Sequence, residues 1–277
     1  MSGRTTGEIE ASLRTVRRFK EKLFSRFAKA VVRYRLVEPG DKIAVCISGG
    51  KDSMLMGKLF QQLRDCRESP FDLEFLVMDP GYRAENRRAI EDNAARLGLP
   101  VTVFDSPIFD AVYQVEKSPC YLCARMRRGY LYQRARELGC NKIALGHHYD
   151  DVIETILMGM LWGGQVQTML PKLRSVNYPG MVLIRPMYLV REEDIIAWAN
   201  HNDLRFLQCA CRFTDEASGE GVSVSKRLET KRLIRELRKT NSQVEANIFH
   251  SVENVNLDTL ISYHKGSEAH SFLDDYE

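Results

Sequence analysis

The chain has 277 residues, of which 44% are hydrophobic and 28% are charged, a composition typical of a globular protein with a real core. No apolar run approaches the ~20 residues of a membrane-spanning helix, and the N-terminus has no apolar signal segment, so we expect a cytoplasmic protein with no membrane partner. The net charge of +3 is uneven, because residues 1–35 carry ten Lys and Arg against three acids. This basic arm indicates a polyanionic partner, although a solvated helix face explains it equally well.

The first predicted element is one helix over residues 9–36, because apolar residues recur there at spacings of three and four. Its other face carries most of the Lys and Arg of the basic arm, and Pro39-Gly40 ends it. The apolar run at residues 42–47 then predicts a strand that is buried on both faces of a parallel sheet.

Short apolar runs alternate with helical patterns through the middle of the chain. The predicted strands are residues 42–47, 73–78, 101–104, 142–145 and 182–184. This alternation predicts an α/β fold with a doubly wound, parallel, five-stranded sheet of Rossmann-like type. We divide the chain into an N-terminal basic helix, the α/β domain and a small helical C-terminal appendage: residues 1–38, 39–212 and 213–277.

The predicted first strand leads into a loop with the composition of a phosphate-binding site: Ser48-Gly49-Gly50-Lys51-Asp52-Ser53. Two glycines let the backbone approach phosphate oxygens, and the N–H groups of the following helix point at them. The two serines add hydroxyl groups. Lys51 adds a positive charge, and Asp52 is placed to hold Mg²⁺. The loop is not a Walker A motif, because Asp52 stands where that motif has Ser or Thr. A tight turn that merely needs glycine explains fewer of these residues.

A second polar stretch follows the predicted fourth strand: Gly146-His147-His148-Tyr149-Asp150-Asp151. Because the carboxyl ends of parallel strands meet at one edge, we expect this loop beside the first one. We assign four of its residues to nucleotide binding: Gly146, His147, Asp150 and Asp151. A two-zinc site is the rival interpretation, but the His pair lacks the spacing of helical zinc ligands. An acidic helix N-terminus explains the Asp residues but not the His pair. Asp79 ends the second strand, where such folds usually bind the base and ribose of a nucleotide.

The seven cysteines are an odd number in a chain without a signal segment, which argues against a disulfide framework. Four of them lie in two tight pairs, Cys120 with Cys123 and Cys209 with Cys211. A structural zinc site with four thiolates is one interpretation, and an iron–sulfur cluster on three cysteines is the other. The remaining three are expected to be small buried hydrophobic residues: Cys46, Cys66 and Cys140.

The glycine loop resembles that of the PP-loop ATPases, a family that contains the N-type ATP pyrophosphatases and tRNA-modifying enzymes. Three further stretches closely resemble the TtcA family, which makes 2-thiocytidine in tRNA: CYLCARMRRGYLYQRARELGCNKIALGHHYDD, WGGQVQTMLPKL and LIRPMYLVREEDI. The likeness covers about residues 13–240. It implies a PP-loop fold of the HUP type, and it implies that residues 48–53 bind the leaving pyrophosphate of ATP. It also implies a [4Fe–4S] cluster on three cysteines: Cys120, Cys123 and Cys211, with Cys209 as the substitute for the third.

We therefore expect an ATP-dependent tRNA sulfurtransferase that adenylates the C2 carbonyl of a cytidine in the anticodon loop and replaces its oxygen with cluster-borne sulfur. Lys51, Asp52 and Asp151 are the predicted catalytic residues. A cysteine desulfurase is the kind of sulfur donor this chemistry needs. The alternative is a PP-loop ATP pyrophosphatase that acts on another RNA base or a small molecule and holds structural Zn²⁺. The oligomeric state is left open, with a homodimer as one candidate.

Overall fold

The computed structural model describes residues 4–66, 70–108, 119–207 and 226–276, with the backbone alone described for residues 119–124 and 275. The chain divides into two compact units. The first comprises Met1–Asp151 with Leu170–Ser223, and the second comprises Val152–Met169 with Val224–Glu277.

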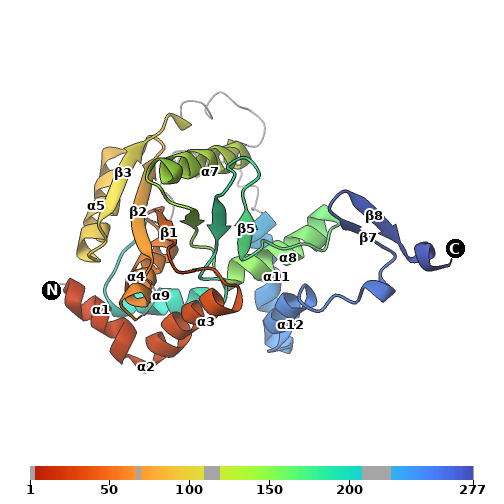
Figure 1. Cartoon of the computed structure of the whole chain (residues 1–277). Coiled ribbons are helices and arrows are strands. Elements are labelled where there is room, and N and C mark those ends of the chain that lie inside the picture. Colours follow the sequence, from red (N-terminus) through yellow and green to blue (C-terminus); the bar gives the residue numbers. More distant parts are fainter. Residues whose placement is uncertain (1–3, 67–69, 109–118, 208–225, 277) are drawn as a thin grey trace, which may run out of the picture. The chain divides into compact units, whose positions relative to one another are not determined.

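A six-stranded sheet forms the centre of the first unit (Figure 1). Its strands are β1 (Lys42–Ile47), β2 (Asp72–Asp79), β3 (Val101–Asp105), β4 (Lys142–Ala144), β5 (Lys172–Arg174) and β6 (Val182–Ile184). The spatial order is β3-β2-β1-β4-β6-β5, in which β5 alone is antiparallel to its neighbour. The five predicted parallel strands are confirmed. The edge strand β5 was not predicted, because Leu173 between two basic residues gives no apolar pattern and its side chain stays 43% exposed.

The order of the strands creates a crevice between β1 and β4. β1 pairs with β2 on one side and with β4 on the other, both in parallel. The connections that leave β1 and β4 therefore diverge at the carboxyl edge of the sheet, and this switch point is where open α/β sheets bind ligands. Residues 48–50 and 145–148 are those two connections.

Helices cover both faces of the sheet, as the doubly wound prediction requires. One face packs against α4 (Lys51–Cys66), α5 (Ala84–Arg96) and α9 (Glu192–His201), and the other packs against α7 (Pro119–Glu137) (Figure 1). Alternate residues of β1 show the division: Ile43 and Val45 belong to the first core, whereas Ala44 and Cys46 belong to the second.

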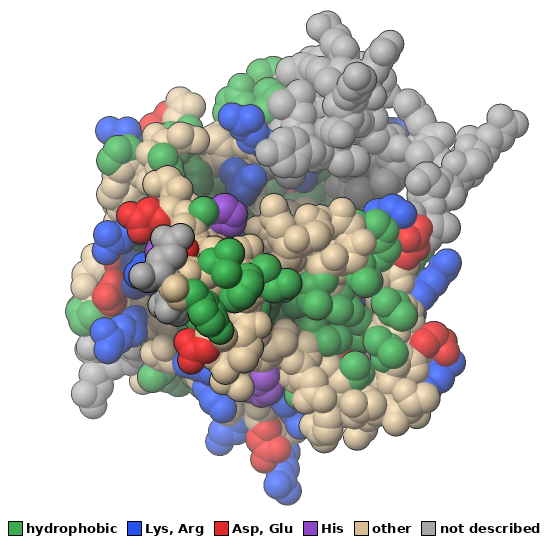
Figure 2. Space-filling model, turned by 90° about the vertical axis from the view of Figure 1, so that its right-hand side faces the viewer, with side chains coloured by type: hydrophobic (Ala, Val, Ile, Leu, Met, Phe, Trp, Pro, Cys, Tyr) green, Lys and Arg blue, Asp and Glu red, His purple; other side chains and the backbone are tan. Residues whose placement is uncertain are grey.

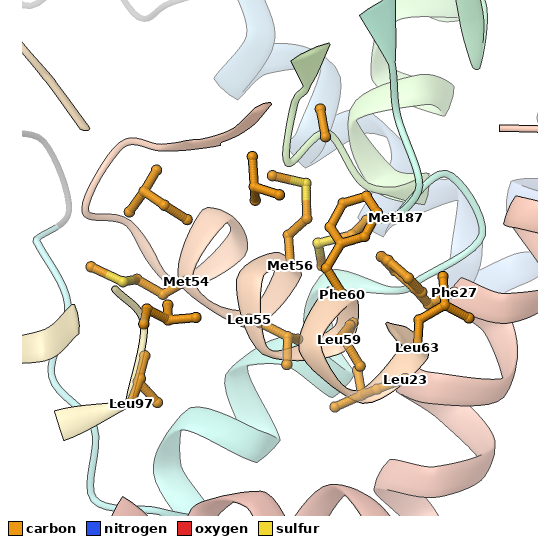
Figure 3. Packing of buried hydrophobic residues seen from close by; sticks show 14 of the residues in the cluster. Leu23, Phe27, Met54, Leu55, Met56, Leu59, Phe60, Leu63, Leu97 and Met187 are labelled. Carbon is orange, nitrogen blue, oxygen red and sulfur yellow. The ribbon is translucent and has the colours of Figure 1, made fainter. Parts of the chain in front are cut away.

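Ten of the 16 residues of α4 are buried, and the polar ones among them are Ser53, Lys58 and Gln62. Figure 3 shows its Met54, Met56 and Phe60 among side chains from several other segments, Phe27 among them. A helix whose middle turns are apolar on most sides must be enclosed there. This enclosure holds the first turn of α4, and with it the glycine loop, in a fixed place.

The N-terminal segment corrects the prediction of one continuous helix. It forms α1 (Thr6–Thr15), α2 (Arg17–Phe19), a π-helix (Lys20–Phe24) and α3 (Ser25–Arg33). The break is at Val16, whose φ of −75° and ψ of 110° are extended. Leu13, Phe19 and Phe27 are all buried in the first core, so the apolar spacing runs on across the break. Because the spacing is uninterrupted, the sequence pattern does not reveal the bend.

The second unit contains the continuation of α8 (Tyr149–Gly163), α11 (Lys226–Thr240), α12 (Val244–Ser251) and a hairpin of β7 (Ser262–Lys265) with β8 (Glu268–Ser271). The helices α11 and α12 agree with the predicted helical appendage, whereas the hairpin was not predicted. Its two-residue turn begins at Gly266 with φ +66°, a Gly-Ser signal that we did not interpret as a turn. Hydrophobic side chains gather on the face in Figure 2, and in this unit Trp162, Ile261 and Phe272 are exposed. Within the described ranges, no helix is both long and apolar enough to cross a membrane.

Candidate functional site

The first loop, Ser48 to Gly50, depends on glycine for its shape. Gly49 has φ +86°, in the left-handed region that L side chains rarely adopt. A Cβ on Gly49 would lie 2.5 Å from Cγ1 of Ile90 in α5. Both the backbone angle and the neighbouring helix therefore exclude a side chain at this position.

Hydroxyl groups hold the ends of this loop together. The Ser48 N–H donates to Ser53 Oγ over 3.0 Å, and the two serine hydroxyls are 3.1 Å apart. The Ser53 hydroxyl in turn donates to the Gly50 carbonyl over 3.0 Å. Strand β1 is thereby tied to the first turn of α4, whose N–H groups are the natural donors for phosphate oxygens.

The Lys51 ammonium lies between two carboxylates. Its Nζ is 3.2 Å from Oδ2 of Asp52 and 3.1 Å from Oε1 of Glu192 in α9. Burial by itself lowers the pKa of Lys51, but the two carboxylates together outweigh burial and raise that pKa above its usual value. The ammonium therefore stays charged at neutral pH. Sequence reasoning did not assign Glu192 to the site, although it lies in the family-like stretch LIRPMYLVREEDI, because its contact with Lys51 spans 141 residues and cannot be read from local spacing.

One oxygen of the Asp52 carboxylate takes part in no hydrogen bond with the described residues. This oxygen, Oδ1, is buried. Burial raises the pKa of Asp52, and the repulsion from Asp151 adds to this, against the attraction of His148 and Lys51. A buried carboxylate oxygen that accepts no hydrogen bond fits a divalent cation. Among the described residues no three His, Cys, Asp or Glu side chains are arranged as a metal site, so Mg²⁺ here would also need phosphate oxygens, as it often does.

The second loop touches the first one through Gly146. A Cβ on Gly146 would lie 3.1 Å from the Ser53 nitrogen and 3.2 Å from its Cα. These are backbone atoms of a buried helix and have little room to move. The glycine therefore allows the β4 connection to approach the N-terminus of α4, and the predicted proximity of the two loops is observed.

Inside the second loop, two hydrogen bonds join His148 and Asp151. The His148 N–H donates to Asp151 Oδ2 over 3.0 Å, and the Asp151 N–H donates to His148 Nδ1 over 3.3 Å. Because Nδ1 accepts, the proton of the neutral imidazole is on Nε2, the nitrogen nearer Asp52. The site prediction named the half-buried His147, whereas His148, which it left out, is the buried side chain that faces the first loop.

Asp150 is engaged with the start of α9. Its Oδ2 accepts the Glu192 N–H over 2.7 Å, and its Oδ1 is 3.1 Å from the Arg191 guanidinium. The same guanidinium lies over the Tyr149 ring, 5.0 Å from the centroid. Both oxygens of Asp150 therefore already have partners that fix α9 to the second loop.

Asp79 is likewise engaged, in the turn that follows β2. Its Oδ1 accepts the N–H groups of Gly81 at 2.8 Å and Tyr82 at 2.6 Å. Its Oδ2 is 3.2 Å from the Arg87 guanidinium, which also contacts Asp105 at 2.8 Å. In this structure Asp79 shapes the loop at the carboxyl end of β2.

A cleft of about 500 Å³ opens beside the glycine loop. On one side it is lined by Gly50, Lys51, Asp52 and Glu192. On the other side it is lined by Ile196, Ala199, Asn200, Leu204, Phe206 and Leu207. Its size and its mixture of apolar walls with a few charged groups are those of a small-molecule site.

The cysteines divide by location. Cys120 and Cys123 lie in the first turns of α7, and Cys209 and Cys211 lie outside the described residues. Two other thiols are buried as expected, and burial raises the pKa of Cys46 to about 12 and that of Cys140 to about 11. Both therefore stay protonated at neutral pH, as expected of small buried hydrophobic residues. Cys66 is exposed, contrary to expectation, because α4 leaves the core at its last turn.

Comparison with known proteins places the chain in a family. The family model for the PP-loop domain matches residues 18–212. The tRNA-cytidine(32) 2-sulfurtransferase of Anaeromyxobacter dehalogenans (strain 2CP-C) is 35% identical over 246 residues, which cover 88% of this chain and 82% of that protein. The tRNA-cytidine(32) 2-sulfurtransferase 1 of Francisella philomiragia is 36% identical over 245 residues, covering 85% and 90%.

Among solved structures, the U34-tRNA thiolase NcsA from Methanococcus maripaludis with its [4Fe-4S] cluster has a TM-score of 0.68 at 20% identity. The match covers 92% of this chain and 86% of that one, and it shows a shared fold. The family model and the sequence relatives confirm the resemblance expected from the motifs. The chain belongs to the PP-loop family and, within it, to the TtcA family.

Proposed function

We propose that this chain is an ATP-dependent tRNA sulfurtransferase that converts cytidine 32 of the anticodon loop to 2-thiocytidine. The names of its relatives supply the tRNA position, and the PP-loop family supplies the use of ATP. The observation that carries the proposal for this chain is the approach of Gly146 to the Ser53 backbone. It joins a phosphate-binding loop and an Asp-rich loop at the switch point of the sheet, where a nucleotide can contact both.

In the first step, the cytidine O2 attacks the α-phosphorus of ATP. A bond forms between O2 and the α-phosphorus, the bond to the bridging oxygen breaks, and pyrophosphate leaves. The loop Ser48–Ser53 would bind this pyrophosphate through its N–H groups and hydroxyls, and Lys51 would offset the negative charge that develops on it. Asp52 and Asp151 would hold Mg²⁺, which supplies further charge neutralisation when bound.

In the second step, a hydrosulfide ion attacks C2 and forms the carbon–sulfur bond. AMP leaves with the original oxygen, and the sulfur loses its proton to solvent. AMP is a far better leaving group than hydroxide, so the ATP cleaved in the first step makes the exchange possible. A single-stranded loop suits this chemistry because its bases can be splayed out of the stack.

The cysteines Cys120, Cys123 and Cys211, with Cys209 as the substitute for the third, would hold the [4Fe–4S] cluster. Cluster-type ligation is supported by two thiols three residues apart on one helical turn. Later in the same helix, Met126 and Tyr130 pack near Met78 at the carboxyl end of β2. When bound, such a cluster supplies an iron with an open position that can carry sulfide.

The route of the chain toward the second cysteine pair also favours a site beside the glycine loop. The Leu207 carbonyl lies 3.9 Å from the position that a Cβ on Gly50 would take. Leu207 is the last residue described before this pair, and Cys209 follows two positions later in the sequence.

Basic surfaces in each unit favour a polyanion such as tRNA. In the first unit, residues 1–35 carry ten Lys and Arg against three acids, and Arg17 among them is 89% exposed while it pairs with Glu21. In the second unit, α11 carries seven Lys and Arg against two Glu, and Arg232 and Arg235 on it are exposed. Phosphate contacts of this kind give tRNA affinity without sequence preference.

The test is thiolation by protein purified without oxygen. Protein, ATP, Mg²⁺, inorganic sulfide and a tRNA transcript are incubated, and the digested nucleosides are analysed by mass spectrometry. We expect 2-thiocytidine and stoichiometric pyrophosphate from tRNA with cytidine 32, and neither from the same tRNA with uridine 32. Cys123→Ala should lose visible absorption and thiolation but retain ATP binding, while Cys66→Ser retains all three. Colourless protein that contains zinc, or thiolation by metal-free protein, would refute the cluster-dependent mechanism.

A further inference from the structure

Lys51 meets a second carboxylate that the phosphate loop itself does not contain. Its Nζ is 3.1 Å from Oε1 of Glu192, and neither side chain is more than 26% exposed. The neighbouring Asp52 contacts the other side of the same ammonium at 3.2 Å. The ammonium is therefore held between α4 and α9 at the wall of the cleft that Gly50, Lys51 and Glu192 share.

The position of Glu192 is fixed by the second loop. Its backbone N–H donates to Asp150 Oδ2 over 2.7 Å, and the preceding Arg191 pairs with Asp150 at 3.1 Å. The opposite side of α9 is anchored in the core by Ile195 and Trp198, both fully buried. A carboxylate on a helix held at both its cap and its apolar face has little freedom to move.

These contacts connect the two loops and α9 in a ring around the crevice. Asp52 contacts Lys51, Lys51 contacts Glu192, and the Glu192 backbone contacts Asp150 of the second loop. The second loop returns to Asp52 through His148 Nε2 at 3.9 Å. The two loops and α9 are thus coupled around the Lys51 ammonium, which the proposed reaction uses.

We infer that Glu192 is a positioning residue for Lys51, which directs the ammonium across the cleft toward the phosphates. This inference rests on the proposed function for its effect on turnover but not for its effect on phosphate binding. Glu192 has two opposite consequences. Its charge repels a bound polyphosphate, and its contact pre-organises Lys51 for the charge that develops as pyrophosphate leaves.

The variant Glu192→Gln separates these consequences, because it keeps the size of the side chain and removes its charge. We expect its Kd for inorganic pyrophosphate, measured by calorimetry, to fall roughly 3-fold or more as repulsion is lost. We expect its kcat for tRNA-dependent pyrophosphate release to fall roughly 10-fold, because the Lys51 ammonium loses the carboxylate that positions it. Asp150→Asn, which loosens the cap of α9, should shift both constants in the same directions by less. Glu192→Asp, which keeps the charge, should recover part of kcat.

The matched control is Glu193→Gln, which removes the same charge from the next, exposed position of α9. It should leave both constants within twofold of the wild-type values. A Glu192→Gln protein that behaves like this control overturns the inference, and so does one that loses pyrophosphate binding together with thermal stability. If the wild-type chain shows no turnover with tRNA, the proposed function fails, whereas the pyrophosphate measurement still decides the role of Glu192.

Discussion

The imidazole Nε2 of His148 lies 3.9 Å from Oδ1 of Asp52, across the boundary between the two loops of the crevice. His148 is 5% exposed, and its Nδ1 accepts the Asp151 N–H, which leaves Nε2 as the protonated nitrogen facing the carboxylate. The distance exceeds that of a direct hydrogen bond, so a small shift or a bridging water molecule would complete the contact.

Replacing His148 should therefore weaken the coupling of the two loops. We expect His148→Ala to lower kcat for pyrophosphate release roughly 10-fold, because Asp52 loses the neighbour that stabilises its ionised form. His148→Gln, which restores an N–H donor of similar reach, should recover part of that loss. Steady-state kinetics on both variants checks this, and equal losses in the two would contradict a hydrogen-bonding role.

The raised pKa of Asp52 predicts how stability depends on pH. Because folding raises this pKa, mainly through burial, the folded chain binds the proton more tightly than the unfolded chain does. The free energy of unfolding therefore falls as pH rises from the ordinary aspartate pKa through the raised pKa of Asp52. This loss of stability persists at neutral pH.

Asp52→Asn removes this loss of stability. At pH 7 we expect its Tm to exceed that of the wild type by an amount on the order of 2 °C, with the gap closing toward pH 3. The same variant should lose turnover, because an amide does not hold Mg²⁺ as a carboxylate does. Thermal melts across this pH range check the sign. A variant that is less stable than the wild type at pH 7 would contradict the assignment of burial as the dominant cause.

One added methyl group at Gly146 should lower both the stability of the fold and the affinity for ATP. A Cβ there would press on the Ser53 nitrogen and Cα at 3.1 and 3.2 Å. We expect Gly146→Ala to lower the free energy of unfolding by about 1–3 kcal/mol, and to weaken ATP binding by displacing the start of α4. Gly7→Ala is the control, because Gly7 lies in helix α1 with nothing within 4 Å of the added Cβ. It should raise stability by about 0.5–1 kcal/mol, and urea titrations of both variants measure the contrast.

The basic helix α11 predicts the salt dependence of tRNA binding. Arg232 and Arg235 are exposed on it, whereas Arg238 pairs with Glu245 at 3.6 Å. We expect Arg232→Gln combined with Arg235→Gln to weaken binding and to reduce the slope of log K against log salt by roughly 1 to 2. Arg238→Gln should change the slope less than either single variant. Filter binding at several salt concentrations measures these slopes, and an unchanged slope in the double variant would exclude Arg232 and Arg235 from the contact.

Local sequence patterns predicted most of the fold and the position of the first loop. The five parallel strands and the loop Ser48–Ser53 follow from neighbouring residues, because an apolar run, a glycine pair and a helix start are all encoded within a few positions. The bend at Val16 and the edge strand β5 escaped the sequence analysis for a shared reason. Each depends on its neighbours in space. The apolar spacing runs unbroken across the bend at Val16, and β5 has no apolar spacing at all.

The sequence by itself determined that two polar loops follow two buried strands and that paired thiols open one helix. Only the tertiary structure decided how these groups divide their tasks. It set Glu192 against Lys51, it engaged both oxygens of Asp150 in holding α9, and it left Oδ1 of Asp52 without a hydrogen bond from the described residues. Such contacts join residues more than forty positions apart, and their energies depend on distance and burial, which no spacing along the chain encodes.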